Sequence, residues 1–404
     1  MKILLLNLYY PPDTSATAKM ALTVVDAICV HHHVTVLCGR PSYDSTERRP
    51  WRLYQTENAS LVRIIRAGST AFPRFNMKKR LINYLSYVWL AVPRALLLDC
   101  DAILAMTDPP FQGIVGAFVA LLKQKPYAYN IRDLYPDMAV GGDIVRRGFL
   151  ARLWERMHRW ALRRAKCVIV LGEDMRARII AKGVAPSRVV VIRDGAELPK
   201  ATEPSPSPDP EIVRAIRGGF SFVLLHAGNL GFYGAWNTLI TAARKLANDG
   251  VGMVFVGGGA LRTQLEIAAA GAENIRFLDY FPANKVLSVL AAADAHIVTV
   301  KRGLAGVVVP SKMYGILAAG KPIVAVAPKE TDVVSLGVKQ GFAVAADPDK
   351  PAELVNLIRA LIADVKKLRA MGEAARNAAP LYDRTSELQK YLKVFDGLTA
   401  PLKI

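Results

Sequence analysis

Short apolar runs alternate with helical stretches along both halves of the chain, and this alternation sets the strongest limit on the fold. The runs read as strands covered on both faces, because apolar residues follow one another without a regular polar partner. Such strands with helices between them predict parallel, doubly wound sheets. The runs are residues 2–6, 34–38, 61–66, 102–106, 128–131, 168–171 and 189–192 in the first half, and 222–227, 252–256, 275–277, 296–300, 323–327 and 341–344 in the second.

A proline-rich segment divides the 404 residues into two parts. Residues 199–210 read PKATEPSPSPDP and contain five prolines, which fix φ and cannot donate a backbone hydrogen bond. They predict an extended linker, which we place at residues 199–212. We therefore expect an α/β protein with two Rossmann-like domains, at residues 1–198 and 213–384, and a ligand cleft at the carboxyl ends of their strands. The amphipathic stretch within residues 385–404 is expected to pack back on the first domain.

The chain is strongly basic, with 53 Lys and Arg against 34 Asp and Glu and a formal net charge of +19. Residues 1–200 hold 30 of the basic and 16 of the acidic residues, so most of the excess lies there. Nucleic acid, nucleotide phosphates and an anionic bilayer all fit this charge. No nucleic-acid-binding module is recognisable among the motifs, and we do not expect nucleic acid as a partner.

Composition and cysteine spacing indicate a globular protein of a reducing compartment. Hydrophobic residues make up 52% of the chain, enough for each domain to bury a core, which excludes a disordered chain. The scattered Cys29, Cys38, Cys100 and Cys167 show no zinc-ligand spacing, so we expect free thiols and no metal. No apolar stretch approaches the ~18 residues of a spanning helix, and the first apolar run is too short for a signal peptide. We expect a cytoplasmic protein.

The histidines are weak candidates for catalysis. Residues 31–33 are all histidine, but adjacent side chains point apart, which argues against a metal triplet. His158 falls in a basic helix predicted at residues 150–164 and is expected on its solvated face. His226 and His296 are expected in the core.

The clearest local signal in the second half surrounds Pro310, Ser311 and Lys312. Pro310 ends an extended run and Ser311 suits an N-cap, which predicts a helix start. The first amides of that helix, with the charge of Lys312, could bind phosphate oxygens. A capped helix without a ligand explains the same residues equally well.

Two glycine clusters precede this helix, HAGNLG at residues 226–231 and GGG at residues 257–259. Glycines after a strand let the backbone approach a bulky ligand. Neither cluster completes a dinucleotide-binding fingerprint, so each alone is more often a matter of chain geometry.

In the first half, polar and aromatic residues gather in three loops at predicted strand ends, residues 9–19, 107–110 and 130–137. The carboxyl ends of parallel strands are where binding and catalytic groups collect. For Arg132 and Asp133, an ion pair at a helix start is the structural alternative.

Two basic segments predict contact with an anionic membrane surface. Residues 74–80 are followed by several aromatic and apolar side chains, and residues 150–164 are rich in arginine. Basic residues between exposed aromatics can hold a protein against an anionic leaflet. The alternative is a solvated face beside ordinary core. The aromatic and apolar side chains in and after residues 74–80 are Phe75, Leu81, Tyr84, Tyr87 and Trp89.

Taken together, these stretches resemble the retaining GT-B glycosyltransferases of family 4, the group 1 transferases, and most of all the fucosaminyltransferase-like branch of bacterial polysaccharide biosynthesis. The resemblance runs nearly end to end. Its order and spacing over two domains make it specific, although each motif is loose. The motifs include YYPPDTSATA, MTDPPFQG and YNIRDLYPD in the first half, and HAGNLG, VFVGGG and VVVPSKMYGILAAGKPIVAV in the second.

The resemblance implies a nucleotide-sugar donor held by the second domain and an acceptor held by the first. It puts Arg132 and Asp133 at the reacting sugar, and it implies no metal or other cofactor. The residues assigned to the donor are Gly228, Asn229, Gly257, Gly258, Tyr280, Phe281, Lys301, Val308, Val309, Pro310, Ser311 and Lys312. Those assigned to the acceptor, from the strand-end loops, are Asp13, Thr14, Ser15, Asp108 and Tyr135.

The sequence departs from the family pattern at several of these places. Many relatives carry two glutamates eight positions apart, the second of which holds the ribose; here Val307 and Gly315 stand there. Arg132 stands where many relatives have histidine. The Arg and Lys that often follow the Gly-Asn turn are replaced by Phe232, Tyr233 and Gly234, and Lys301, Arg302 or Lys312 is expected to supply the missing charge.

We therefore expect a membrane-associated retaining glycosyltransferase that moves a sugar from a nucleoside diphosphate, by preference UDP, to a glycan or polyprenyl-linked acceptor in cell-surface polysaccharide synthesis. Two alternatives stay open. One is a nucleotide-sugar epimerase of the same architecture, and the other is a non-catalytic member that binds glycan or lipid.

Overall fold

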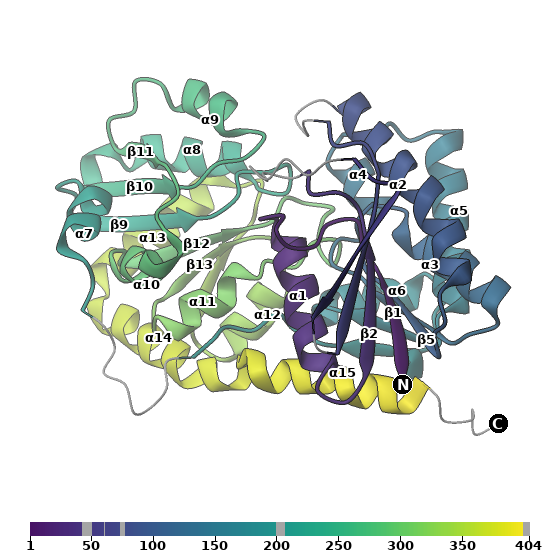
Figure 1. Ribbon diagram of the computed structural model, residues 1–404. Helices are drawn as coiled ribbons and strands as arrows, with labels where there is room; N and C mark the ends of the chain where they lie inside the picture. The colour runs from purple at the N-terminus through teal and green to yellow at the C-terminus, as the bar shows by residue number, and fades with distance from the viewer. Residues whose placement is uncertain (43–50, 60, 73–76, 199–206, 399–404) are drawn as a thin grey trace. The chain divides into compact units, whose positions relative to one another are not determined.

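The computed structural model describes residues 1–42, 51–59, 61–72, 77–198 and 207–398. The chain divides into two compact units, Met1–Ile192 together with the segment from Glu387, and Arg193–Ser386. The first unit ends at Ile192, ahead of the boundary expected at residue 198. Each unit is a sheet covered by helices (Figure 1).

The first unit is built on an eight-stranded sheet with the order β3-β4-β2-β1-β5-β6-β7-β8. All neighbouring strands are parallel except β3 and β4, which pair antiparallel. The strands are β1 (Lys2–Leu6), β2 (His33–Cys38), β3 (Tyr54–Ala59), β4 (Val62–Ala67), β5 (Ala102–Ala105), β6 (Tyr127–Asn130), β7 (Cys167–Val170) and β8 (Val189–Val191). The helices are α1 (Ala16–Ile28), α2 (Met77–Leu97), α3 (Gln112–Lys123), α4 (Asp137–Gly141), α5 (Phe149–Arg164), α6 (Glu173–Ala181), the 3₁₀ turn η1 (Pro186–Arg188) and α15 (Arg384–Leu398).

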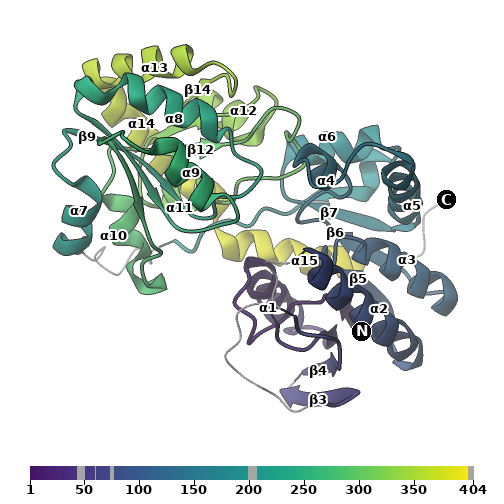
Figure 2. The ribbon, with the colours of Figure 1, turned by 90° about the horizontal axis from the view of Figure 1, so that it is seen from above.

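Helices cover both faces of the first sheet. The core on one face joins α1 and α15 to the sheet, and Tyr391 and Phe395 of α15 are buried in it. On the other face, α2, α3 and α5 lie side by side (Figures 1 and 2). Gly116 lets α3 approach the sheet, because a Cβ there would lie 2.7 Å from the Cβ of Ala105.

The second unit contains a six-stranded parallel sheet with the order β11-β10-β9-β12-β13-β14. Its strands are β9 (Phe222–Ala227), β10 (Val251–Val256), β11 (Ile275–Leu278), β12 (Ala295–Thr299), β13 (Ile323–Val326) and β14 (Ala343–Ala346). Its helices are α7 (Pro210–Arg217), α8 (Trp236–Lys245), α9 (Arg262–Ala269), α10 (Val286–Ala291), α11 (Lys312–Ala318), α12 (Asp332–Lys339), α13 (Pro351–Ala363) and α14 (Val365–Ala378), with 3₁₀ turns η2 (Ala247–Asp249), η3 (Ala283–Lys285) and η4 (Ala379–Tyr382).

The expected fold class, two doubly wound parallel sheets, is confirmed. The structure has one strand that the sequence did not predict, β3. It is an edge strand, and its sequence YQTENA lacks the apolar run that marked the others.

The last three residues of the expected linker are helical. Residues 199–206 lie outside the described residues, and residues 210–212 form the first turn of α7 instead of extended chain. Asp209 caps this helix by accepting a hydrogen bond from Glu211 N at 3.1 Å, and Pro210 occupies the first turn, where its missing N–H costs nothing.

Two expectations about exposure are wrong. His158, placed on the solvated face of the basic helix, is buried, and burial lowers its pKa to about 4. Tyr84 and Tyr87, expected among the exposed aromatics near residues 74–80, are also buried, whereas Trp89 is 82% exposed. Residues 74–76, and with them Phe75, lie outside the described residues. His226 and His296 are buried as expected.

Candidate functional site

Two glycine-rich turns meet at the carboxyl ends of β9 and β10 in the second unit. Gly228 N donates to Val256 O and Leu230 N donates to Gly258 O, each at 2.7 Å. Gly257 has a φ of +136°, and a Cβ there would lie 2.2 Å from the carbonyl oxygen of Gly228. Only glycine fits such an approach, so the two turns form one continuous backbone surface.

The side chain of Lys312 extends to this surface. Its Nζ lies 2.6 Å from Nε2 of His226, at the end of β9, and donates to Oη of Tyr233 at 2.8 Å. Tyr233 Oη in turn donates to the carbonyl oxygen of Asn229. Gly228 leaves room for the lysine, because a Cβ there would lie 2.8 Å from Lys312 Cε. We call Lys312, His226 and Tyr233 the lysine cluster.

The lysine cluster is positioned to attract an anion. Burial lowers the pKa of Lys312 from 10.5 to about 7, and burial together with Lys312 lowers the pKa of His226 well below its ordinary value. Within the part of the chain that the structure describes, no carboxylate forms an ion pair with Lys312. A phosphate bound there would supply the missing negative charge and restore the ammonium form.

A helix begins at Lys312, where the sequence predicted one, and Ser311 occupies its N-cap position. The Ser311 side chain makes no capping hydrogen bond, and α11 is only seven residues long. Val308 is buried, and Val309 and Pro310 are half-buried. The side chain of Lys312, rather than a capped helix end, is therefore the element here that can meet a diphosphate.

Of the two aromatic residues assigned to the donor base, only Tyr280 is open to a ligand. Its side chain is 62% exposed and borders the glycine turn, since a Cβ at Gly258 would lie 3.6 Å from Tyr280 Cε2. A base could stack on such a ring. Phe281 packs against the buried cluster that includes Ile216 and Val289.

The three residues expected to supply positive charge differ in their surroundings. Arg302 forms ion pairs with Asp347, at 2.6 Å, and with Asp349. Lys301 donates its backbone N–H to Tyr233 O at 2.7 Å, which ties the end of β12 to the loop after β9. Lys312 is the one whose charge is directed into the glycine turns.

In the first unit, hydrogen bonds join the loops that follow β5 and β6. Arg132 N donates to Thr107 Oγ1 at 2.7 Å, and Thr107 Oγ1 donates to the carbonyl oxygen of Asn130 at 3.3 Å. Asp108 N donates to Asn7 Oδ1 at 3.3 Å. The loops after β1, β5 and β6 are thereby held together at the carboxyl edge of the sheet.

An arginine from α2 completes this edge. The guanidinium of Arg80 donates to Oη of Tyr84. Burial raises the pKa of Asp108, and a hydrogen bond with Thr17 and the positive charges of Arg80 and Arg132 act to lower it. Burial also holds the pKa of Tyr135 well above its ordinary value, an effect that Asp133 and Asp108 reinforce. We call Arg80, Tyr84, Asp108, Arg132 and Tyr135 the arginine–tyrosine cluster.

The remaining acceptor candidates mostly support the loop after β1. Asp13 is buried, and its Oδ1 accepts a hydrogen bond from Ser42 N at 2.8 Å. Ser15 Oγ accepts from Ala18 N at 3.0 Å and caps α1. Thr14, between them, is exposed.

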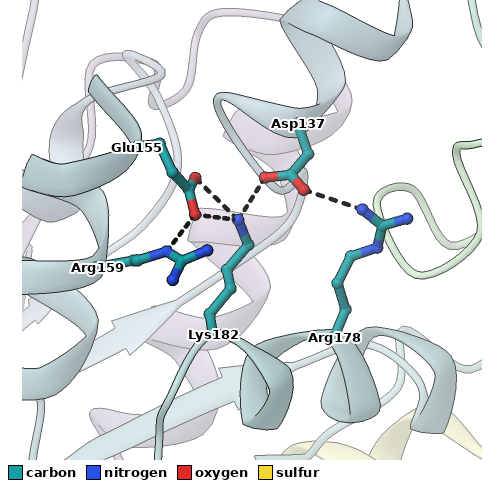
Figure 3. A network of polar contacts seen from close by, with 5 residues as sticks. All are labelled: Asp137, Glu155, Arg159, Arg178 and Lys182. Carbon is teal, nitrogen blue, oxygen red and sulfur yellow. Dashed lines mark hydrogen bonds and ion pairs between the residues drawn. The ribbon is translucent and has the colours of Figure 1, made fainter. Parts of the chain in front are cut away.

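An ion-pair network fixes the loop that carries Arg132 and Asp133 to the helices behind it (Figure 3). Lys182, at the end of α6, lies 2.7 Å from Asp137 Oδ2 and 2.8 Å from Glu155 Oε1. Arg178 pairs with the other oxygen of Asp137 at 2.9 Å, and Arg159 pairs with Glu155 at 2.6 Å. Asp137, the first residue of α4, is thus paired with two cations of the neighbouring helix end.

Four residues of these clusters were not singled out from the sequence as site residues: Arg80, Tyr84, His226 and Tyr233. Arg80 precedes Tyr84 by one helical turn, but only the fold brings it to the strand ends. His226 looked like an ordinary core histidine, and its burial fits that interpretation. The signal that could have found it is its position immediately before the Gly-Asn turn.

Comparison with known proteins identifies the family of the chain. Residues 18–195 match the glycosyl transferase 4-like domain, and residues 218–378 match the glycosyl transferases group 1 family. A glycosyltransferase from Pseudomonas aeruginosa, WbjE, is 25% identical over 71% of this chain and 74% of its own length. WcaI of Escherichia coli K12, described as a colanic acid biosynthesis glycosyl transferase, is 24% identical over 98% of each chain.

Among solved structures, HepE from Anabaena in complex with UDP-glucose superposes with a TM-score of 0.66. The match covers 98% of this chain and 100% of HepE at 18% identity, so it speaks to the fold alone. The two family matches together cover 339 of the 404 residues and include most of each unit. This chain therefore belongs to the group 1 glycosyltransferases of family 4 and has their GT-B fold.

Proposed function

We propose that the enzyme transfers a sugar from a UDP-sugar to a glycan or polyprenyl-linked acceptor, with retention of the anomeric configuration and without a metal ion. The observation that carries the proposal is the lysine cluster: a positive charge is held against two glycine turns, and no carboxylate among the described residues pairs with it. UDP is favoured as the carrier because the similar fold of HepE binds UDP-glucose.

In this proposal the lysine cluster binds the donor diphosphate. Lys312 Nζ would contact phosphate oxygens, and the backbone of Gly228 and Gly257 would allow the diphosphate to lie close to the sheet edge. Tyr280 would stack on the base. The ribose would be held without a carboxylate, because Val307 and Gly315 stand at the two glutamate positions.

The chemistry then needs charge stabilisation more than a general acid. The bond between the sugar C1 and the diphosphate oxygen breaks, an acceptor oxygen bonds to C1 from the same face, and the acceptor proton passes to the departing diphosphate. Lys312 would stabilise the charge that develops on the diphosphate. Arg132 and Asp133 would contact the reacting sugar from a loop fixed by Thr107 and the network around Lys182.

We propose further that the first unit binds the anionic inner face of a membrane. Its helix α5 exposes five arginines and carries one acidic residue, Glu155. Helix α2 exposes Met77, Leu81, Leu85 and Trp89 at successive intervals of four residues, which places them in one stripe. Each basic residue near an anionic surface contributes about 1 kcal/mol. No helix among the described residues is long and apolar enough to cross a membrane.

Donor binding and turnover test the proposed function. Melting of the full-length protein is measured with UDP, GDP, ADP, TDP and CMP, with and without magnesium. We expect UDP alone to raise the melting temperature by several degrees, because a ligand at 100 times its dissociation constant stabilises by about 2.7 kcal/mol. Magnesium should not matter. With UDP-sugars, UDP release is measured, and NMR of the product gives its anomeric configuration.

The matched variants are Lys312→Met and Lys339→Met, the latter an exposed lysine at the end of α12. Only the first should lose the response to UDP. No response to any nucleotide would overturn the donor assignment, and a response with an inverted product would overturn retention. Membrane binding is measured separately, by sedimentation with vesicles containing phosphatidylglycerol. Trp89→Glu should weaken it and Ile267→Glu, an exposed position in the second unit, should not.

A further inference from the structure

Two apolar cavities in the first unit join into one channel between α2, α3 and α5. The wider has a volume of about 730 Å³ and the other about 620 Å³. Both are lined by Ile114 and Val115 of α3 and by Leu153 and Met157 of α5. Because four residues line both cavities, the two adjoin, and we treat them as one apolar channel.

The channel is long in the direction of α2. It extends from Met77 to Val92 on that helix, a distance of about 22 Å at 1.5 Å per residue. A compact metabolite would fill only part of it. A flexible hydrocarbon chain matches both its length and its apolar lining.

One end of the channel is polar and belongs to the arginine–tyrosine cluster. Arg80, Tyr84 and Tyr135 line the wider cavity. The channel therefore starts where the proposed acceptor site is and continues away from it along the helices. A ligand with a phosphate at one end and a hydrocarbon chain behind it would match Arg80 in charge and the channel in polarity.

We propose that this channel holds the hydrocarbon chain of a polyprenyl-phosphate-linked acceptor, with the lipid phosphate at Arg80. The inference rests on the proposed function, because it gives the acceptor a lipid anchor. A peptide is a poorer occupant, since the shared walls offer only hydrocarbon side chains and its backbone amides would stay unpaired. The exposed stripe of α2 is continuous with the channel, so a lipid in an adsorbed bilayer has a short path into it.

The test uses soluble isoprenoids and the full-length protein. Binding of farnesyl diphosphate, isopentenyl diphosphate and farnesol is measured by titration calorimetry below micelle-forming concentrations. Because each buried methylene contributes about fourfold in affinity, we expect farnesyl diphosphate to bind at least tenfold more tightly than the five-carbon diphosphate. Arg80→Met should remove most of the preference for farnesyl diphosphate over farnesol.

A matched pair of variants locates the chain. Leu153→Glu puts a carboxylate where the two cavities join, and Leu121→Glu makes the same change on α3 outside the channel. The two leucines are 43% and 41% exposed, so both variants should fold equally well. Circular dichroism and the response to UDP, whose site lies in the second unit, check this. We expect Leu153→Glu to weaken farnesyl diphosphate at least tenfold and Leu121→Glu less than twofold.

The proposal is overturned if the two diphosphates bind equally, or if both variants weaken binding to the same extent, which would indicate adsorption to exposed apolar surface. It is also overturned if the protein sediments with vesicles but binds no isoprenoid. In any of these cases UDP binding and turnover can still succeed, so failure of the channel and failure of the proposed function are distinguishable.

Discussion

Replacing Lys312 by methionine should stabilise the ligand-free protein at neutral pH, although it removes two hydrogen bonds. The lysine pKa falls from 10.5 in the unfolded chain to about 7 in the folded protein, which corresponds to a cost of at most about 5 kcal/mol below pH 7. Leaving His226 Nε2 without its partner costs about 1–3 kcal/mol. The balance is a gain of about 2 kcal/mol, or about 4–8 °C in melting temperature for a unit of this size.

The pH dependence of this gain is the sharper part of the prediction. A lysine whose pKa is lowered on folding destabilises the protein by its full amount at any pH below the folded-state pKa. This destabilisation disappears as the pH rises to the unfolded-state pKa. The gain from Lys312→Met should therefore be greatest at pH 7 and below, and it should shrink by at most about 1.4 kcal/mol per pH unit between pH 7 and 10.5.

Calorimetric melting of both proteins from pH 6 to pH 10 measures this difference. By pH 10 the variant should have become the less stable protein, because the lost hydrogen bonds then outweigh the small remaining cost of the lysine charge. Lys339→Met is the control and should change stability by less than about 0.5 kcal/mol at any pH. A Lys312→Met variant that is no more stable at pH 7, or whose gain is the same at every pH, would refute the reasoning.

Three further outcomes are expected. At pH 8, UDP binding to the wild type should take up nearly one proton, because the diphosphate returns Lys312, whose pKa is about 7 in the free protein, to its ammonium form. Calorimetry in buffers of different ionisation enthalpy measures the number of protons taken up, and Lys312→Met should take up none. Gly257→Ala should lower the free energy of unfolding by at least about 2 kcal/mol and abolish UDP binding, because a Cβ there would lie 2.2 Å from Gly228 O. Chemical denaturation measures the loss. Gly271→Ala, where a Cβ meets no atom within 4 Å, is the control for positive φ alone. Lys182→Met should lower the free energy of unfolding by about 3–5 kcal/mol, because Asp137 and Glu155 lose the cation that they share. A loss below about 1 kcal/mol in the same denaturation assay would show that the network contributes little.

The sequence was most informative about the buried strands. Parallel strands covered on both faces are continuous apolar runs, so thirteen of them could be expected from the sequence, and the structure has strands at each place. β3 was not predicted because none of its residues is buried and its sequence YQTENA carries no apolar run. The arginine-rich helix was expected, but which of its faces is covered depends on the rest of the fold. His158 was assigned to the wrong side, because its ring packs against Tyr129 of β6, with 5.7 Å between ring centroids.

The site could be predicted only in part from the sequence, because some of its contacts form between segments that are distant along the chain. The glycine turns and Lys312 lie in motifs that can be recognised along the chain. Their contacts with Tyr233 and His226 depend on how the loops after β9 and before α11 fold together. Arg80 is the clearest case, because nothing local distinguishes it from Lys78 and Lys79, yet the structure brings its guanidinium to the hydroxyl of Tyr84.

The position of α15 has a consequence for the order in which the protein can form during synthesis. The second unit, Arg193–Ser386, is one uninterrupted stretch and can be complete as soon as it leaves the ribosome. The first unit cannot be complete at that stage, although its sheet is synthesised first. Asn130 lacks the hydrogen bond to the hydroxyl of Tyr391, which is 2.7 Å long in the folded protein, and the core lacks Phe395. Until the last residues of α15 emerge, the earlier-made sheet keeps an apolar face open to water, and this nascent intermediate is the form most exposed to aggregation and most in need of a chaperone.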